Sequence, residues 1–210
     1  MLLKVLNEDG STCHGGKAQW SLPVKNGDGT WTPGEWMPAI EGALVPCRNG
    51  YHLCRAQDLL SWLGPAIFEA EYRGEMVEST DKIAVREARL LRQFENWNAR
   101  TARLLACEYA ERVLPLFERV YPEDGAPRHA IETSRRCAIG DATDEELDAA
   151  WTAARDAADT AASATAWAAA RAAASAAARA AAWTAARAAA WTAEREWQIG
   201  RLREYLEGRV

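Results

Sequence analysis

The sequence lacks the features that membrane-spanning, exported and nucleic-acid-binding proteins usually need. No stretch of 18 uncharged apolar residues occurs in it, so we expect no membrane span. The start, MLLKVLNED, lacks the basic region and long apolar core of a signal peptide. The formal charge of −5 and the pI near 5.4 argue against general nucleic-acid binding. These absences favour a cytoplasmic location.

Cysteine and histidine are too few and too poorly spaced to predict a metal or catalytic site. Five cysteines, an odd number without an export signal, indicate reduced thiols. The residues of the right type for zinc are Cys13, His14, Cys47, His52 and Cys54. No C-x-x-C pair is present, and His52 and Cys54 would share one strand face. We expect buried structural thiols, and we assign no catalytic residue, no cofactor and no metal.

Glycine and proline are absent between Asp141 and Ile199, where alanine dominates and a helical structure is predicted. Asp141 and Thr143 are both candidate N-caps, and Thr143 is favoured because Glu146 would complete a capping box with it. From Trp151 on, every fourth residue is large or polar, and a step of four overshoots one helical turn by about 40°. A single rod would therefore carry this stripe around every side. We expect two shorter helices with a break in Asp156–Thr165, and the uninterrupted rod is the alternative.

Tryptophan and arginine dominate the later positions of this period-four pattern, which we call the Arg–Trp ladder. Trp183–Arg187 and Trp191–Arg195 have the spacing for stacked pairs on a helix surface. The tryptophans have two roles open to them: filling a core under arginine stems, or forming a binding surface. The candidate interaction residues are Arg171, Arg179, Trp183, Arg187, Trp191 and Arg195.

The chain changes character near residue 95, which predicts an α+β protein: a small mixed domain at 1–95 and an alanine-rich helical domain at 96–210. The strand candidates are Leu2–Leu6, Ala43–Val45, Tyr51–Leu53, Ile67–Tyr72 and Lys82–Leu91, with a helical turn at Ala56–Leu63. The alternation slips between Val85 and Ala88, where a bulge or a change to helix is expected. We expect Trp20, Trp31, Trp36 and Trp62 to supply much of the first core.

Two further helices are predicted before the alanine tract. The first covers Phe94–Tyr121, and Pro115 inside it should kink it or end one segment. The second covers Arg128–Ala138, and Gly140 closes it.

The landmarks of this helical part resemble a known family. In order they are ACEYAERVLPLFE at 106–118, Pro122-Glu-Asp124, Pro127-Arg128, Ala130-Ile-Glu132 and Gly140, followed by the alanine-rich tract. They resemble the bacteriocin-immunity-protein-like helical domain, over about 106–197. The resemblance implies an all-α domain, a role in bacterial or phage conflict and no known catalytic residues. Arg128 and Glu132 have the spacing of a helix ion pair.

The first part of the chain resembles a small domain of unknown function found in phage and bacterial proteins. The matching residues are Thr12-Cys-His-Gly15, CRNGYHLC at 47–54, Asp58-Leu-Leu60 and FEAEYRG at 68–74. This resemblance implies no mechanism, but together the two resemblances imply a phage or mobile-element protein.

Three functions follow as hypotheses. The first is a non-enzymatic phage or mobile-element protein that inhibits or neutralises a host or competitor protein through its helical domain. It predicts a protein partner and no membrane or nucleic-acid partner. Self-association through alanine faces stays open.

The second hypothesis is an NAD-dependent enzyme. The order of His14, Tyr51 and a later glutamate (Glu69, Glu71 or Glu75) is similar in outline to the His–Tyr–Glu set of ADP-ribosyltransferases, which implies NAD binding. The third is a nucleotide-sequestering pocket that stacks a base on Trp20, Trp31 or Trp36.

Overall fold

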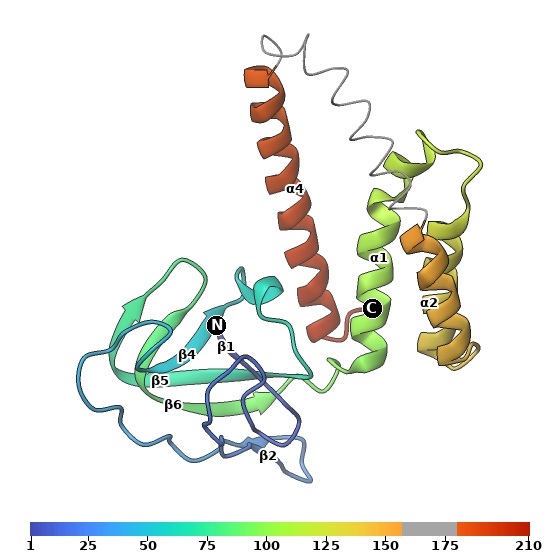
Figure 1. Ribbon diagram of the computed structural model, residues 1–210. Helices are drawn as coiled ribbons and strands as arrows, with labels where there is room; N and C mark the ends of the chain where they lie inside the picture. Colours follow the sequence, from blue (N-terminus) through green and yellow to red (C-terminus); the bar gives the residue numbers. More distant parts are fainter. Residues whose placement is uncertain (157–179) are drawn as a thin grey trace. The chain divides into compact units, whose positions relative to one another are not determined.

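The computed structural model describes residues 1–156 and 180–210, and within 180–191 it describes the backbone alone. The chain forms two compact units, which we call the barrel unit (Met1–Asn98 with Leu202–Val210) and the helical unit (Ala99–Arg201). The strands lie in the barrel unit and most of the helices in the helical unit (Figure 1). This arrangement confirms the predicted α+β class.

Four antiparallel strands close the barrel in the order β1-β4-β6-β5. They are β1 (Leu2–Leu6), β4 (Tyr51–Arg55), β5 (Ala66–Glu78) and β6 (Ile83–Gln93), and a separate pair joins β2 (Val24–Lys25) to β3 (Trp31–Thr32). Closure leaves no unpaired sheet edge in the barrel. The prediction of a strand at Ala43–Val45 is wrong, since Val45 makes only an isolated bridge to Asn49. The helical turn expected at Ala56–Leu63 is shorter in the structure, where only the 3-10 turn η1 (Leu59–Ser61) forms.

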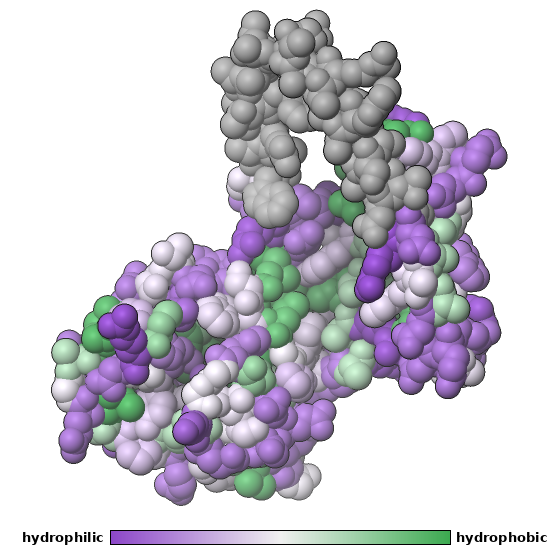
Figure 2. Space-filling view, in the orientation of Figure 1, coloured by the Kyte–Doolittle hydropathy of each residue, from purple (hydrophilic) through white to green (hydrophobic). Residues whose placement is uncertain are grey.

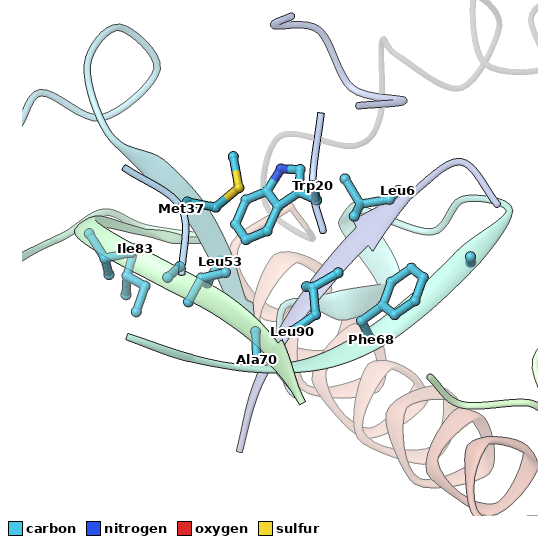
Figure 3. Close-up of a cluster of buried hydrophobic side chains, with 11 residues drawn as sticks. Leu6, Trp20, Met37, Leu53, Phe68, Ala70, Ile83 and Leu90 are labelled. Carbon is cyan, nitrogen blue, oxygen red and sulfur yellow. The ribbon is translucent and has the colours of Figure 1, made fainter. Parts of the chain in front are cut away.

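Apolar side chains from all four barrel strands pack into one cluster (Figure 3). Trp20 and Met37 reach this cluster from the long connection between β1 and β4, and Trp20 is 3% exposed. The predicted tryptophan core is therefore correct for Trp20. It is wrong for Trp31, Trp36 and Trp62, which are half-buried. Their rings carry cations instead: Lys25 over Trp31, Arg73 and Arg89 over Trp36, and Lys82 over Trp62.

The expected irregularity near Val85–Ala88 is present, but its extra residue lies on the partner strand. The register between β5 and β6 shifts between Arg73 and Met76, opposite Glu87 and Val85. Gly74 lies in this bulge with φ +80°, a conformation that L side chains rarely adopt. The bulge therefore accommodates the slip that the alternation of β6 predicted.

The helical unit begins with α1 (Ala99–Glu118) and α2 (Ala126–Ile139), followed by a helix described from 144 to 156. Pro115 was expected to kink or end its segment, and α1 ends at Glu118, within one turn of it. Gly140 closes α2 with φ +86°, as predicted, and its N–H donates to the carbonyls of Arg136 and Cys137. The expected Arg128–Glu132 pair is replaced by a bidentate contact between Arg128 and Glu118, at 2.7 and 2.9 Å.

The predicted capping box at Thr143 is confirmed. The Thr143 N–H donates to Glu146 Oε2 at 2.8 Å, and the Glu146 N–H donates to Thr143 Oγ1 at 3.2 Å. These two bonds satisfy backbone donors that the first helical turn leaves without partners. The break expected in Asp156–Thr165 lies, apart from Asp156, outside the described residues.

The last helix, α4 (Ala180–Leu206), contacts α1 through polar side chains. The Tyr109 hydroxyl donates to the Gln198 carbonyl at 2.6 Å, and Arg112 Nε donates to Glu194 Oε2 at 2.6 Å. The guanidinium of Arg112 also lies 4.3 Å from the ring centre of Trp197. Across the two described stretches of the chain, no helix combines the length and apolarity that crossing a membrane requires.

Candidate functional site

The barrel unit contains a pocket of about 520 Å³. Its walls come from β1, the loop at 12–16, the segment 47–54, Trp62 and Lys82. Three of the lining side chains are cationic (Lys4, Arg48 and Lys82), two are histidines (His14 and His52), and none is acidic. The sequence order separates these groups widely, and strand pairing brings them to one place.

Lys4 is the least expected lining residue, because it interrupts the apolar strand β1. Its Nζ donates to the carbonyl oxygen of His52 at 3.0 Å and lies 4.9 Å from the ring centre of Trp20. Burial lowers the pKa of this ammonium to about 8, while the nearby thiols of Cys13 and Cys54 act in the opposite direction. Lys4 is therefore mostly charged at pH 7 although its side chain is half-buried.

The two histidines of the pocket are held by backbone groups. The Cys47 N–H donates to His52 Nε2 at 2.8 Å, so neutral His52 carries its proton on Nδ1. Burial, followed by the charges of Lys4 and Lys82, lowers the pKa of His52. His14 Nε2 donates to the carbonyl oxygen of Trp62 at 2.8 Å. His52 is thus neutral at pH 7 and adds no charge to the pocket.

The cysteines near the pocket differ in exposure. Cys54 is buried, as predicted for a structural thiol, whereas Cys13 is half-buried and Cys47 is exposed, so the prediction is wrong for Cys47. Burial, with a smaller effect of Asp58, raises the pKa of Cys54 to about 12, which leaves a thiol and no nucleophile. Within residues 1–156 and 180–210, no group of three or more His, Cys, Asp or Glu residues is placed to hold a metal ion.

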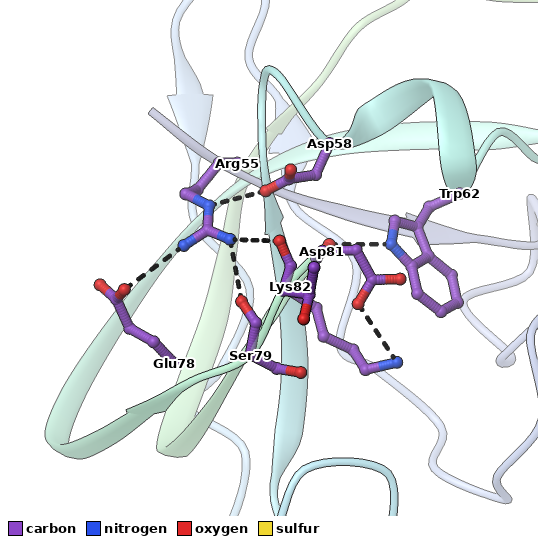
Figure 4. A network of polar contacts seen from close by, with 8 residues as sticks. Arg55, Asp58, Trp62, Glu78, Ser79, Asp81 and Lys82 are labelled. Atoms are coloured by element: carbon purple, nitrogen blue, oxygen red, sulfur yellow. Dashed lines mark hydrogen bonds and ion pairs between the residues drawn. The ribbon is translucent and has the colours of Figure 1, made fainter. Parts of the chain in front are cut away.

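A polar network holds two of the lining residues, Trp62 and Lys82 (Figure 4). Arg55 donates to Asp58 Oδ2 at 2.6 Å and to the carbonyls of Ser79 and Thr80 at 3.1 and 3.2 Å. Trp62 Nε1 donates to the Asp81 carbonyl at 2.9 Å, and Lys82 Nζ lies 4.4 Å from the Trp62 ring centre. The β5–β6 turn is thereby tied to the segment after β4, which fixes Trp62 and Lys82 at the pocket.

The residues proposed for NAD binding do not come together. The Tyr51 hydroxyl donates to the Pro38 carbonyl at 2.9 Å, and its ring packs edge-on against Trp20 in the core. The three candidate glutamates form ion pairs with arginines of β6: Glu69 with Arg92, Glu71 with Arg89 and Glu75 with Arg86. None of these four residues lines the pocket that holds His14. The His–Tyr–Glu cleft is therefore not formed, because the Tyr51 ring packs into the core and the glutamates pair with arginines of β6.

The tryptophans proposed to stack a nucleotide base do not line the pocket either. Trp20 is in the core, and cations cover Trp31 and Trp36. Sequence reasoning missed Lys4 and Lys82. A charged residue in the middle of an otherwise apolar strand was the available signal for Lys4, and nothing local marked Lys82.

The Arg–Trp ladder is described only in part. Arg171 and Arg179 lie outside the described residues, and Trp183, Arg187 and Trp191 lie in α4 where only the backbone is described. Arg195 is half-buried in α4. Trp151, the first position of the period-four pattern, is 53% exposed and donates from Nε1 to Ser134 Oγ at 3.2 Å.

The described surface of the helical unit also exposes an apolar stripe on α1 and just beyond its end. Val113, Leu116 and Val120 are 47%, 62% and 64% exposed. The spacing of three residues places Val113 and Leu116 on one side of α1, and Val120 follows in the turn after the helix. In Figure 2 the visible surface is mostly hydrophilic, interrupted by small hydrophobic patches. An exposed apolar stripe of this kind is typical of an interaction surface.

Residues 92–193 match the family model described as "Imm-5 like putative immunity protein". This match agrees with the immunity-like resemblance of the helical part and indicates an immunity-type role for it. No curated protein and no solved structure matches the chain. The resemblance of the first part to a phage-associated domain has no support from these comparisons.

Proposed function

We propose that this protein is a non-enzymatic immunity protein, which binds a toxic protein of a host or competitor through its helical unit and neutralises it. The observation that carries the proposal is the family match over residues 92–193, which covers α1, α2 and the alanine-rich tract. A link to phage or another mobile element stays a prediction.

The proposed contact surface is the Arg–Trp ladder, with the apolar stripe of Val113, Leu116 and Val120 as a second contact. Tryptophan and arginine are the residues most enriched at binding hot spots. The segment 160–192 carries three arginines and no acidic residue, so a partner with an acidic surface would complement it. The exposed stripe supplies apolar area that an arginine-rich surface alone lacks.

The experiment begins with capture of a partner from lysate by wild type and by the variant Trp183→Ala/Arg187→Ala/Trp191→Ala. The captured protein is then expressed alone and together with each version, and cell growth is measured. We expect it to arrest growth alone, wild type to restore growth, and the ladder variant to lose at least about tenfold in affinity. Circular dichroism checks that the variant keeps its helix content.

A matched control variant, Lys17→Ala/Trp31→Ala, removes a cation and a tryptophan from the barrel unit and should protect as wild type does. Leu116→Ala/Val120→Ala tests the stripe separately. A captured protein that does not impair growth would overturn the immunity role. Full protection by the ladder variant would overturn the ladder as the contact surface.

A further inference from the structure

The pocket of the barrel unit concentrates positive charge without an acidic residue of its own. Lys4, Arg48 and Lys82 line it, and no Asp or Glu does. Asp58 pairs with Arg55 at 2.6 Å, outside the lining. Asp81 lies 3.7 Å from Lys82 and offsets part of its charge, so Lys4 and Arg48 carry the cationic lining that has no carboxylate partner among the described residues. A cavity with this lining repels cations and attracts anions.

The Lys4 ammonium lacks a counter-ion. It has three N–H donors, and its one hydrogen bond goes to the carbonyl of His52. Among the described carboxylates, none lies within ion-pair distance of Lys4 Nζ. A partly buried charge without a counter-ion costs free energy, and an anion in the pocket would recover part of that cost.

The other polar groups around Lys4 do not supply the missing negative charge. His52 is neutral, with Nε2 occupied by the Cys47 N–H. Cys54 is buried as a protonated thiol. The positive charge of Lys4 is therefore left for a bound molecule.

The loops that line the pocket have unusual backbone conformations. Gly15 and Gly16 both have φ +86°, and Cys47 has φ +68°, a value that residues other than glycine rarely adopt. Cys47 holds this conformation while donating to His52, directly before the exposed Arg48. Backbone strain of this kind is common at ligand-binding positions.

We propose that this pocket binds a small phosphate-bearing molecule, with the half-buried Lys4 as its anchor and Arg48 and Lys82 as further contacts to the phosphate oxygens. The volume of about 520 Å³ is that of a small-molecule site. Phosphate is favoured over carboxylate because three separate cations line the pocket, and a terminal phosphate offers three strong acceptor oxygens.

The test is isothermal titration of the full chain with pyrophosphate, and separately with citrate, at constant ionic strength. We expect pyrophosphate to bind wild type, and Lys4→Met to weaken binding at least about tenfold. Arg48→Gln changes an exposed side chain, so it keeps the fold intact, and we expect it to weaken binding about threefold. Arg119→Gln, an exposed arginine in the helical unit, is the matched control and should bind as wild type does.

Absence of pyrophosphate binding to wild type would overturn the proposal. Unchanged affinity in both Lys4→Met and Arg48→Gln would overturn the placement of the site, and citrate binding as tight as pyrophosphate would overturn the choice of phosphate. Tryptophan fluorescence verifies that Lys4→Met keeps Trp20 buried.

Discussion

In the barrel unit, the lining of the pocket comes from β1, the loop at 12–16, the segment 47–54, Trp62 and Lys82, the residue before β6. In the helical unit, the proposed contact surface comes mainly from one continuous tract with a repeat of four residues. The first site exists only after distant strands pair, whereas the second follows from local order along a helix. Substitutions in the barrel unit should therefore change stability by disturbing the packing between distant segments. Substitutions in the helical unit should change it by loosening single helical turns.

Cations also stack on tryptophans in both units, and each stacked pair joins different elements. Arg73 and Arg89, from β5 and β6, lie 4.4 and 4.7 Å from the ring centre of Trp36. Arg112 of α1 lies over Trp197 of α4. Stacking was also predicted within one helix, at Trp183–Arg187 and Trp191–Arg195. Of these four side chains the structure describes only Arg195, so this stays a prediction. In the described pairs, the cation and the tryptophan come from different segments, so the stacking holds those segments together.

The largest effect is expected from Gly34→Ala in the barrel unit. An added Cβ would lie 2.1 Å from the backbone oxygen of Ser21, a contact that no side-chain rotation relieves. The Gly34 N–H also donates to the Leu90 carbonyl of β6 at 2.9 Å, so the segment cannot move away freely. We expect a loss of at least about 3 kcal/mol in the free energy of unfolding, measured by urea titration with tryptophan fluorescence.

The control for this variant is Gly27→Ala, where an added Cβ meets open space and φ is not positive. Its stability should change by less than about 0.5 kcal/mol. Equal stabilities of the two variants would contradict the tight approach of the segments at Gly34.

The sequence predicted those parts of the molecule whose cause is local. The capping box needs only Thr143 and Glu146, three residues apart, and the α2 stop needs only Gly140, so both are confirmed. The pocket could not be predicted in this way, because pairing of β1 with β4 and β5, and of β4 with β6, brings Lys4, His52 and Lys82 together. The position of Trp36 was missed for a similar reason. The two arginines that stack on it, Arg73 and Arg89, lie far along the chain, so the sequence near Trp36 did not indicate them.

The second prediction concerns the pH dependence of stability at Lys4. The pKa of Lys4 falls from 10.5 to about 8 on folding, mainly through burial, so the charged form opposes folding. Lys4→Met removes that cost and should stabilise the unliganded protein by about 2 kcal/mol at pH 7, after the loss of the bond to His52. Between pH 8 and 10.5 the folded wild type loses this proton before the unfolded chain does. Wild type therefore gains stability as pH rises, and the advantage of Lys4→Met shrinks.

The measurement is a pair of urea titrations at pH 7, 8 and 9, compared as a difference. His52 and Cys54 of β4, and Cys13 of the loop at 12–16, act on the charge of Lys4 and remain in both proteins. The pKa of Cys54 is raised to about 12, which lowers stability above pH 9 in both and largely cancels in the difference. A difference that stays constant from pH 7 to 9 would show that Lys4 is hydrated in the folded protein.

The smallest effect is expected in the helical unit, from Thr143→Ala. The variant loses the bond from the Glu146 N–H to Thr143 Oγ1, and a neighbouring helical turn can fray without disturbing distant segments. We expect a loss of about 1 kcal/mol, measured by urea titration with circular dichroism at 222 nm. Thr143→Ser keeps the accepting hydroxyl and should retain nearly all of the stability. If Thr143→Ala cost as much as Gly34→Ala, the start of this helix would be coupled to distant packing, and the contrast between a locally built helical unit and a barrel built by long-range pairing would fail.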